Sequence, residues 1–488
     1  MSLFAASGCR PAEVAPVAAA PTEIKGIQSG WVLDDSPGAD SGFQLVFDRY
    51  PAILPTIAEL GAEWYRFEFR VTPKAAERAR RRREALGLPL ECEGRCAAED
   101  LGWDADLLAA YGRALDDLRE RHINVLGLVS NGTIAASQAE QIAGSAEADG
   151  GDGDNAYIQN LGSVVLPMLL RRFGDRIHAW EIGNEPDVWT QASPYGAVPG
   201  GGPRPLPGGS FIYPSNFAQL LRRAFYAARA AEEEGVPPVT IVSGGLLSMN
   251  AWSDDPASPG AGAGLFHNAA GVYLQTFVRA GFASAGWGRI VQQFHRLPVD
   301  GWGVHLYVSQ DTPDILRDPW NNFGRYAAAF QAMTGAVAEE YLGAGHALPI
   351  WVTELGFGTP VARVPLDDRT DSLRARYWPY EADGLELAYD CLAQLQTGAP
   401  VFWFTLFDVP NADIESGLFT PVWGTATFAP LTPKPAAARY RQIGVQPASF
   451  DCRRTAPETP RRRVRCKVQP AAAGTGTGEP FSGQCESH

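Results

Sequence analysis

The stretch RIHAWEIGNEPDVW, residues 176–189, joins a short apolar run to a polar end. The run stops at Gly183, and Asn184, Glu185 and Pro186 follow at once. Short apolar runs of this kind are typical of strands that are covered on both faces of a parallel sheet. A carboxylate at the end of such a strand is typical of the catalytic edge of an α/β barrel.

Seven other runs along the chain resemble this strand in being short, apolar and rich in β-forming residues. The eight runs are 27–33, 64–69, 123–129, 179–182, 240–242, 303–308, 350–353 and 401–406. Amphipathic helical patterns lie between most of them, at 105–121, 156–173, 216–234, 270–279, 323–342 and 381–396, and a last one at 435–442 follows the eighth run. Eight strands alternating with helices predict an α/β protein with a (β/α)8 TIM barrel and no sizeable accessory domain.

Several connections after the predicted strands are long and rich in Gly and Pro. The extreme case is GAVPGGGPRPLPGG at 196–209, and the others are 131–155, 248–268, 309–322 and 357–378. Because barrel active sites are built from these connections, we expect them to wall a cleft. An arginine run at 78–83 follows the second strand and is interpreted as a solvated charged turn, with recognition of an anionic substrate as the alternative.

Composition excludes several classes of protein. The chain has 488 residues, of which 45% are hydrophobic and 20% charged, so most of it can build a packed core and is not intrinsically disordered. Its net charge of −14 argues against a general nucleic-acid or anionic-membrane binder. It contains no apolar stretch long enough to span a membrane.

Two glutamates end strands that face each other across the predicted barrel. Glu185 follows the fourth strand, and Glu354 ends the seventh, in LPIWVTELGFG at 348–358. Cleavage of a glycosidic bond needs such a pair, one acid to protonate the leaving oxygen and one carboxylate to attack or stabilise the sugar carbon. The pattern therefore indicates a glycosidase.

These residues resemble those of clan A retaining glycoside hydrolases, which carry catalytic glutamates on strands four and seven. NEP at 184–186 is similar to the acid/base motif of the clan, and TELG at 353–356 to its nucleophile motif. RFEF at 66–69, GVHLY at 303–307 and FWFTLFD at 402–408 follow in the expected order along the chain. Family 39 is the most similar family and family 5 the next, and the resemblance covers about residues 25–445.

The resemblance implies roles for the two carboxylates and for three residues near them. Glu185 is the general acid/base, protonated when the glycoside binds, and Glu354 is the nucleophile that forms a covalent glycosyl-enzyme. Arg66 and Tyr307 hold Glu354 ionised, and Asn184 hydrogen-bonds the 2-hydroxyl of the sugar. A retaining enzyme has its two carboxyl groups about 5–5.5 Å apart.

Two further residues belong to the implied substrate site, His305 on strand six and Trp403, which resembles the sugar-stacking tryptophan of the clan. The alternatives are that His305 is a satisfied barrel histidine and Trp403 a core residue. Alternation along strand four is interpreted as placing Glu181 on the other face of the sheet, as the structural partner of a nearby arginine.

The sequence also departs from the family. Glu68 stands where family 39 often has histidine, and Arg66 could bridge to it instead of to Glu354. The residues after the last helix leave no room for the extra β-domain of family 39 β-xylosidases, so the sugar is not specified.

The ends of the chain and the seven cysteines favour an extracytoplasmic bacterial protein. ASGC at 6–9 resembles a lipoprotein cleavage box that would make Cys9 a lipidation site, with an ordinary N-terminus as the alternative. Cys92 and Cys96 could close a surface loop, and Cys391 lies in a helical pattern and could be buried. The expected domains are a signal-type remnant and tether at 1–22, the catalytic domain at 23–445 and a loosely ordered, cysteine-bearing tail at 446–488.

The predicted function is therefore that of a retaining glycosidase acting on β-linked oligo- or polysaccharides, by a double displacement. A catalytically inactive carbohydrate-binding surface lipoprotein and a transglycosylase that uses the same site are the alternatives. No metal or organic cofactor is indicated, the expected partner is a carbohydrate and not a nucleic acid, and the oligomeric state is open.

Overall fold

A computed structural model of the chain describes sixteen segments. They are residues 25–29, 33–34, 44–49, 51–92, 94–136, 155–187, 212–247, 269–307, 325–356, 359–360, 372–395, 397–408, 414–420, 432–444, 464–468 and 483–487. Cys9 and the expected tether at 1–22 lie outside these segments. Most residues of the long connections that were expected to wall a cleft also lie outside them.

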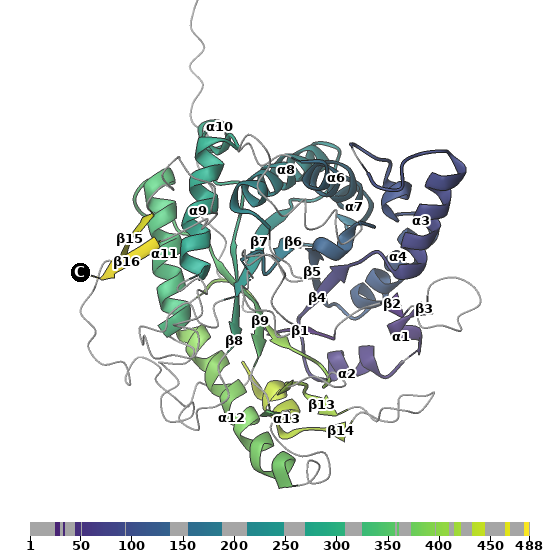
Figure 1. The fold of residues 1–488 in the computed structure, drawn as a ribbon. Helices are drawn as coiled ribbons and strands as arrows, with labels where there is room; N and C mark the ends of the chain where they lie inside the picture. Colours follow the sequence, from purple (N-terminus) through teal and green to yellow (C-terminus); the bar gives the residue numbers. More distant parts are fainter. Residues whose placement is uncertain are drawn as a thin grey trace, which may run out of the picture.

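Eight parallel strands close into a barrel in the order β1-β11-β9-β8-β7-β6-β5-β4 (Figure 1). The strands are β1 (Lys25–Gln28), β4 (Trp64–Phe69), β5 (Asn124–Val129), β6 (Ala179–Asn184), β7 (Thr240–Leu247), β8 (Trp302–Tyr307), β9 (Ile350–Gly356) and β11 (Val401–Phe404). Each overlaps one of the eight predicted runs, and the (β/α)8 prediction is confirmed.

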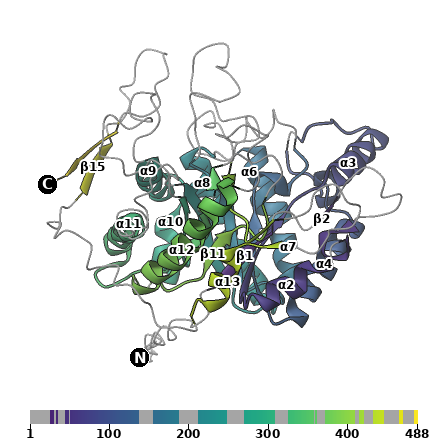
Figure 2. The ribbon, with the colours of Figure 1, turned by 90° about the horizontal axis from the view of Figure 1, so that it is seen from below.

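Helices surround the barrel (Figures 1 and 2). The longer ones are α2 (Ile53–Glu59), α3 (Pro73–Ala85), α4 (Ala105–Glu120), α7 (Leu166–Phe173), α8 (Pro214–Glu233), α9 (Ala269–Ala283), α10 (Trp287–Phe294), α11 (Arg325–Leu342), α12 (Ser372–Gln394) and α13 (Pro435–Gln442). A short helix α6 (Ala156–Asn160) runs through the π-helical turn Leu161–Val165 into α7. Shorter elements are α1 (Val46–Arg49), the 3-10 turns Ala98–Leu101 and Asn131–Thr133, and the strands β2 (Leu33–Asp34), β3 (Gln44–Leu45), β10 (Thr359–Pro360), β12 (Ile414–Glu415), β13 (Phe419–Thr420), β14 (Thr432–Pro433), β15 (Val464–Val468) and β16 (Gly483–Ser487).

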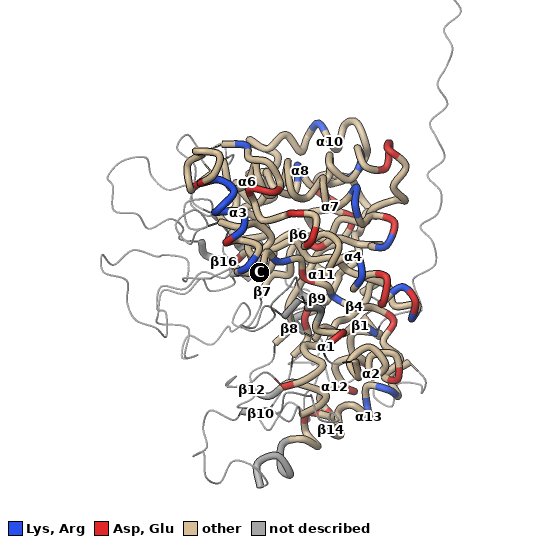
Figure 3. The backbone as a smooth tube through the Cα atoms, turned by 90° about the vertical axis from the view of Figure 1, so that its right-hand side faces the viewer, with Lys and Arg blue, Asp and Glu red and all other residues tan. Residues whose placement is uncertain are grey.

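The arginine run at 78–83 is helical and not a turn. Thr72 caps α3 by accepting a hydrogen bond from the Ala75 N–H at 3.2 Å, and Pro73 occupies the first turn. Ion pairs one helical turn apart, such as those of Arg80 with Glu77 and Glu84, then support the helix. Charge alone does not distinguish a turn from an exposed helix, and in the structure the blue arginine positions lie along α3 (Figure 3).

A cluster of apolar side chains fills the barrel interior near the amino-terminal ends of the strands. Leu126, Ala179, Val242, Trp351 and Phe402 pack together there, together with Ala399 and the partly buried Trp64. Because a strand returns to the same face every two residues, the next inward residues on these strands form a second layer. That layer contains polar side chains, and it carries the candidate site.

Contacts between the two ends of the domain hold the barrel shut. β1 pairs with β11 from Lys25↔Val401 to Gln28↔Phe404. On α13 the hydroxyl of Tyr440 donates to the carbonyl of Gly26 at 2.8 Å, and the Lys25 ammonium lies 5.6 Å from the centre of the Tyr440 ring. The first strand is therefore fixed by residues more than 370 positions later in the chain.

A buried lysine joins three elements at the same end of the domain. Lys434 Nζ lies 3.0 Å from Glu381 Oε2 on α12 and 3.0 Å from Asp408 Oδ1, just after β11. Asp408 also accepts a hydrogen bond from the Gly417 N–H at 2.8 Å. Since the lysine and both carboxylates are buried, removal of the lysine would leave charges in the interior.

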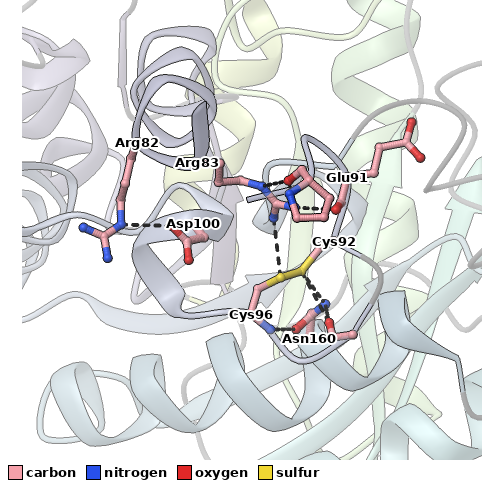
Figure 4. Close-up of a disulfide and its surroundings, with 9 residues drawn as sticks. Arg82, Arg83, Glu91, Cys92, Cys96, Asp100 and Asn160 are labelled. Atoms are coloured by element: carbon pink, nitrogen blue, oxygen red, sulfur yellow. Dashed lines mark hydrogen bonds and ion pairs between the residues drawn. A yellow bond between two sulfur atoms is a disulfide. The ribbon is translucent and has the colours of Figure 1, made fainter. Parts of the chain in front are cut away.

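The expected loop closure by Cys92 and Cys96 and the expected burial of Cys391 are both observed. Cys92 and Cys96 form a disulfide that closes a small surface loop (Figure 4). Cys391 is fully buried on α12 and is also disulfide-bonded. In the tail, β15 and β16 pair antiparallel with Cys466 opposite Cys485.

None of the described helices has the length and apolar character needed to cross a bilayer.

Candidate active site

A backbone kink at the end of β6 presents Glu185. Gly183 has φ of 88° and Glu185 has φ of 47°, a left-handed conformation that is unfavourable for a residue other than glycine. Two backbone hydrogen bonds hold the kink, from the Glu185 N–H to Gly245 O at 3.1 Å and from the Ile212 N–H to Pro186 O at 3.0 Å. Strain of this kind at a carboxylate is typical of a functional site.

Glu354 lies on β9 with its side chain almost completely buried. Arg66 Nη1 donates to its Oε1, and the hydroxyl of Tyr307 donates to its Oε2. Burial, followed by the charge of Glu354, raises the pKa of Tyr307 well above its ordinary value, so the phenol keeps the proton that it donates. The predicted partners of Glu354 are therefore both in contact with it.

Arg66 gathers four acceptors from three strands, β1, β6 and β9. Besides Glu354 they are Glu181 Oε2 at 2.6 Å from Nε, Gln28 Oε1 at 2.8 Å from Nη1 and Asn184 Oδ1 at 2.7 Å from Nη2. Burial alone would lower the pKa of Arg66, but the charges of Glu181 and Glu354 outweigh it and raise the pKa above its usual value. The alternative bridge from Arg66 to Glu68 is not what the structure contains, because Glu68 instead accepts from the Ser130 hydroxyl at 2.8 Å.

His305 lies among three carboxylates. Its Nδ1 is 2.9 Å from Glu185 Oε1 and 3.6 Å from Glu354 Oε2, and its Nε2 is 3.9 Å from Glu181 Oε1. Burial would lower the pKa of His305, but the charges of Glu354, Glu181 and Glu185 outweigh burial and raise the pKa to about 10. The ring is fully buried, so His305 contacts Glu185 and Glu354 and is not exposed at the surface.

Glu181 lies on the same inward side of β6 as Glu185, and its predicted placement on the other face is wrong. Its side chain bonds Arg66 and lies 3.9 Å from His305 Nε2, and both of these partners are in the barrel interior. Its predicted pairing with an arginine is correct, since Arg66 is that partner. Burial would raise the pKa of Glu181, but Arg66 and His305 lower it to about 2.

The two candidate catalytic carboxylates are close. One oxygen of Glu185, one oxygen of Glu354 and one ring nitrogen of His305 all lie within 4.8 Å of one another. Carboxylates and imidazole can ligate a metal ion, and the same three groups can also exchange protons with one another. The arrangement is suited to moving protons between acids.

Trp403 is not in the site. Its ring is fully buried on the helix-facing side of β11, and its indole N–H donates to Ser416 O at 2.9 Å. Phe404 pairs in register with the inward-facing Gln28, is only partly buried, and its ring centre is 6.0 Å from that of Tyr307. Strand alternation therefore makes Phe404 the aromatic ring of β11 beside the carboxylates, and makes Trp403 a core residue.

Three polar residues of the site were not predicted from the sequence. Gln28 ends β1 and bonds Arg66. Glu68 lies two residues beyond Arg66 on the same face, and burial raises its pKa. Asp187, just past Glu185, accepts from the Leu247 N–H at 3.0 Å, and burial raises its pKa to about 7. The sequence did contain a signal for Glu68, because a residue two positions after Arg66 on the same strand lies on the same face.

Comparison with known proteins adds the following. No family model matches the chain, and no curated protein matches its sequence. Among solved structures, a β-glucosidase from Thermotoga maritima in complex with azafagomine is 18% identical over 81% of this chain and 86% of its own, with a TM-score of 0.48. The AHE enzyme from Alicyclobacillus herbarius is 18% identical over 82% of this chain and 86% of its own, with a TM-score of 0.47. A structure of fungal β-1,4-galactanases is 14% identical over 86% of this chain and 99% of its own, with a TM-score of 0.45.

Proposed function

We propose that the chain is a retaining glycosidase that hydrolyses β-linked oligo- or polysaccharides, with Glu185 as the acid/base and Glu354 as the nucleophile. One observation carries the proposal: a carboxylate oxygen of each residue lies within 4.8 Å of the other. Retaining enzymes have carboxyl groups about 5–5.5 Å apart, and inverting enzymes leave about 6.5–9.5 Å for a water molecule.

The charges around the pair support these two roles. Arg66 and His305 supply two positive charges, which balance the ionised Glu181 and one further carboxylate. Glu354 accepts from both Arg66 and Tyr307, whereas Glu185 accepts only from His305 among the side chains of the described segments. Glu354, which two donors hold in place, therefore fits the nucleophile best, and Glu185 fits the acid.

In the first step the Glu354 carboxylate attacks the anomeric carbon, and the bond from that carbon to the leaving oxygen breaks. Glu185 transfers its proton to the leaving oxygen, so that the aglycone departs as an alcohol. In the second step water loses a proton to Glu185 and attacks the same carbon, and the ester bond to Glu354 breaks. Two displacements give net retention.

Two side chains fit the sugar. The Asn184 amide is oriented by its oxygen, which accepts from Arg66, so its nitrogen can donate to the sugar 2-hydroxyl. Phe404 supplies an aromatic face beside Tyr307 for one side of the ring. Both groups are within the layer that holds Glu354.

The test is a screen of aryl glycosides and β-linked polysaccharides, with the product anomer identified by NMR immediately after cleavage. Glu354→Ala should lose turnover by at least about 10⁴-fold, and azide should restore cleavage of an activated aryl glycoside and form a glycosyl azide of inverted configuration. Glu185→Ala should lose far more activity on glycosides with poor leaving groups than on those with good ones.

Initial release of the inverted anomer would contradict the mechanism. Full activity of Glu185→Ala on a poor leaving group would contradict the assignment of the acid. Glycan binding without turnover by the wild-type protein over days would favour a binding protein instead.

A further inference from the structure

The turn that presents Glu185 rests against the end of β7, the neighbour of β6 in the barrel (Figure 1). Pairing between the two strands ends at Asn184↔Gly245, and the next N–H, that of Glu185, donates to Gly245 O at 3.1 Å. A Cβ atom at Gly244 would lie 2.5 Å from the carbonyl oxygen of Gly183, so glycine at this position lets the two strands approach closely. The position of Glu185 is therefore set by contact with β7.

Asp187 extends this contact with its side chain. Its Oδ1 accepts a hydrogen bond from the Leu247 N–H at 3.0 Å, two residues beyond Gly245 on β7. Its other oxygen, Oδ2, is buried and has no hydrogen-bond partner among the described residues. Burial of an unpaired polar atom costs free energy, so stability alone does not explain an aspartate at this position.

A second contact attaches the same turn to α9. The Ile212 N–H donates to Pro186 O at 3.0 Å, and the hydroxyl of Tyr273 on α9 donates to Ile212 O at 2.6 Å. Ile212 and Tyr273 are both buried. The turn is therefore attached to β7 through Glu185 and Asp187, and to α9 through Pro186.

The Glu185 carboxyl depends on this backbone for its position. Among the side chains of the described segments it bonds only His305, whose Nδ1 lies 2.9 Å from its Oε1. Glu185 also has φ of 47°, and a residue other than glycine keeps this costly conformation only while its surroundings hold it. A shift of about 1 Å in a reacting group can lower the rate about 100-fold. Loss of one attachment of the turn should therefore impair acid catalysis.

We propose that Asp187 is a positioning residue for Glu185: its Oδ1 fixes the strained turn on β7, so that the Glu185 carboxyl meets the leaving oxygen of the glycoside. This role rests on the proposed glycosidase function and assigns a further residue to its acid step. Asp187 acts through the hydrogen bond to the Leu247 N–H, and it does not itself touch the substrate. The two competing explanations are that Asp187 supports the fold in general, and that it acts on Glu185 through its charge.

The experiment measures kcat/KM of the full chain at pH 6 on two glycosides of one sugar, a phenyl glycoside and a dinitrophenyl glycoside. Departure of phenol needs a proton from the acid, whereas the dinitrophenolate departs without one. The variants are Asp187→Ala, which removes the acceptor, and Asp187→Asn, which keeps an oxygen for the Leu247 N–H. The matched control is Asp300→Ala, because Asp300 Oδ2 accepts from the Ile241 N–H at 2.9 Å at the other end of β7.

We expect Asp187→Ala to lower kcat/KM roughly 100-fold on the phenyl glycoside and by no more than about threefold on the dinitrophenyl glycoside. Asp187→Asn should recover most of the loss. Burial raises the pKa of Asp187 to about 7, so at pH 6 the amide replaces a mostly neutral carboxyl of nearly the same shape. Asp300→Ala should lower the urea midpoint and leave the ratio between the two substrates unchanged.

Equal losses on both substrates in Asp187→Ala would make Asp187 a support of the fold only and overturn the proposal. A loss in Asp187→Asn as large as that in Asp187→Ala would assign the effect to charge and also overturn it. Should the alanine variant not fold, Asp187→Ser takes its place with the same expectations, since its hydroxyl is one bond too short to reach the position of Oδ1. A wild-type protein that cleaves no glycoside would contradict the proposed function itself, whereas uniform losses in a cleaving enzyme contradict only the role of Asp187.

Discussion

Replacement of His305 by asparagine should remove a pH dependence of stability that the wild-type protein has between pH 6.5 and 10. The pKa of His305 is raised from 6.5 to about 10 by three carboxylates, so the folded protein binds a proton there that the unfolded chain releases. Asparagine keeps a donor near the position of Nδ1 for the hydrogen bond to Glu185 and carries no charge. Titrating groups far from His305 are common to both proteins and cancel in the difference, whereas Glu181, whose pKa His305 helps to lower, contributes to it.

The direction of this pH dependence follows from the linkage between proton binding and folding. Where the folded state binds more protons, the free energy of unfolding falls as pH rises, here by up to about 1.4 kcal/mol per pH unit. The stabilisation is complete below pH 6.5 and is lost as pH passes through about 10, a total of about 5 kcal/mol. From pH 7 to pH 9 the wild-type protein should therefore lose about 3 kcal/mol relative to His305→Asn.

The assay is urea unfolding at several values from pH 6 to pH 9, with the difference in unfolding free energy between the two proteins plotted against pH. Nitrogen NMR of histidine-labelled protein should identify one imidazolium, absent in His305→Asn, that survives at pH 8. A flat difference curve, or a neutral His305 ring below pH 7, would refute the charge assignment. Asp187, whose pKa is raised from 3.8 to about 7, lowers stability as pH rises between those two values and adds little further change between pH 7 and pH 9.

Four other substitutions test residues of the site and residues that support it. Phe404→Ala should raise KM roughly tenfold, because it removes an aromatic face beside the sugar, while Trp403→Phe should leave KM unchanged and lower the free energy of unfolding by about 1–3 kcal/mol. Lys434→Met should lower the free energy of unfolding by about 3–5 kcal/mol, measured by the urea midpoint, because it leaves two buried carboxylates without their cation. Glu68→Gln should raise KM roughly tenfold with a smaller change in kcat, because this partly exposed carboxylate is close enough to Glu354 to feel its charge and can accept sugar hydroxyls.

Each of these changes has a result that would contradict it. If Trp403→Phe changed KM as much as Phe404→Ala, the assignment from strand alternation would be wrong. Stability within 1 kcal/mol of wild type for Lys434→Met would mean that the two acids find other partners. A kcat that falls as far as kcat/KM in Glu68→Gln would move Glu68 from substrate binding into the transition state.

The barrel could be predicted from the sequence because its signal is repeated. Eight apolar runs separated by helical patterns specify one architecture even where the ends of individual strands are misplaced by several residues. The contacts of Glu354 with Arg66 and Tyr307 were implied by the resemblance to clan A glycoside hydrolases, and the structure contains both.

The errors have a common physical origin. Trp403 and Glu181 lie on other faces of their strands than the sequence predicted. The register of β11 and the backbone of β6 decide which face each residue takes, and chemical type does not. The arginine run was misread because net charge does not report hydrogen bonding, and a cap at Thr72 with turn-spaced ion pairs makes it helical. The raised pKa of His305 could not be predicted, because it depends on three carboxylates from β6 and β9 that only the closed barrel brings to β8.

The pairing of β1 with β11 has a consequence for synthesis of the chain. Until residues 401–404 have left the ribosome, β1 lacks one of its two neighbours, and β9 exposes an unpaired edge to solvent. The catalytic layer needs the same event, since Gln28 on β1 and Phe404 on β11 are register partners. A nascent chain shorter than this should therefore hold an open, aggregation-prone sheet, and chaperones would have to protect it until almost the whole domain has been made.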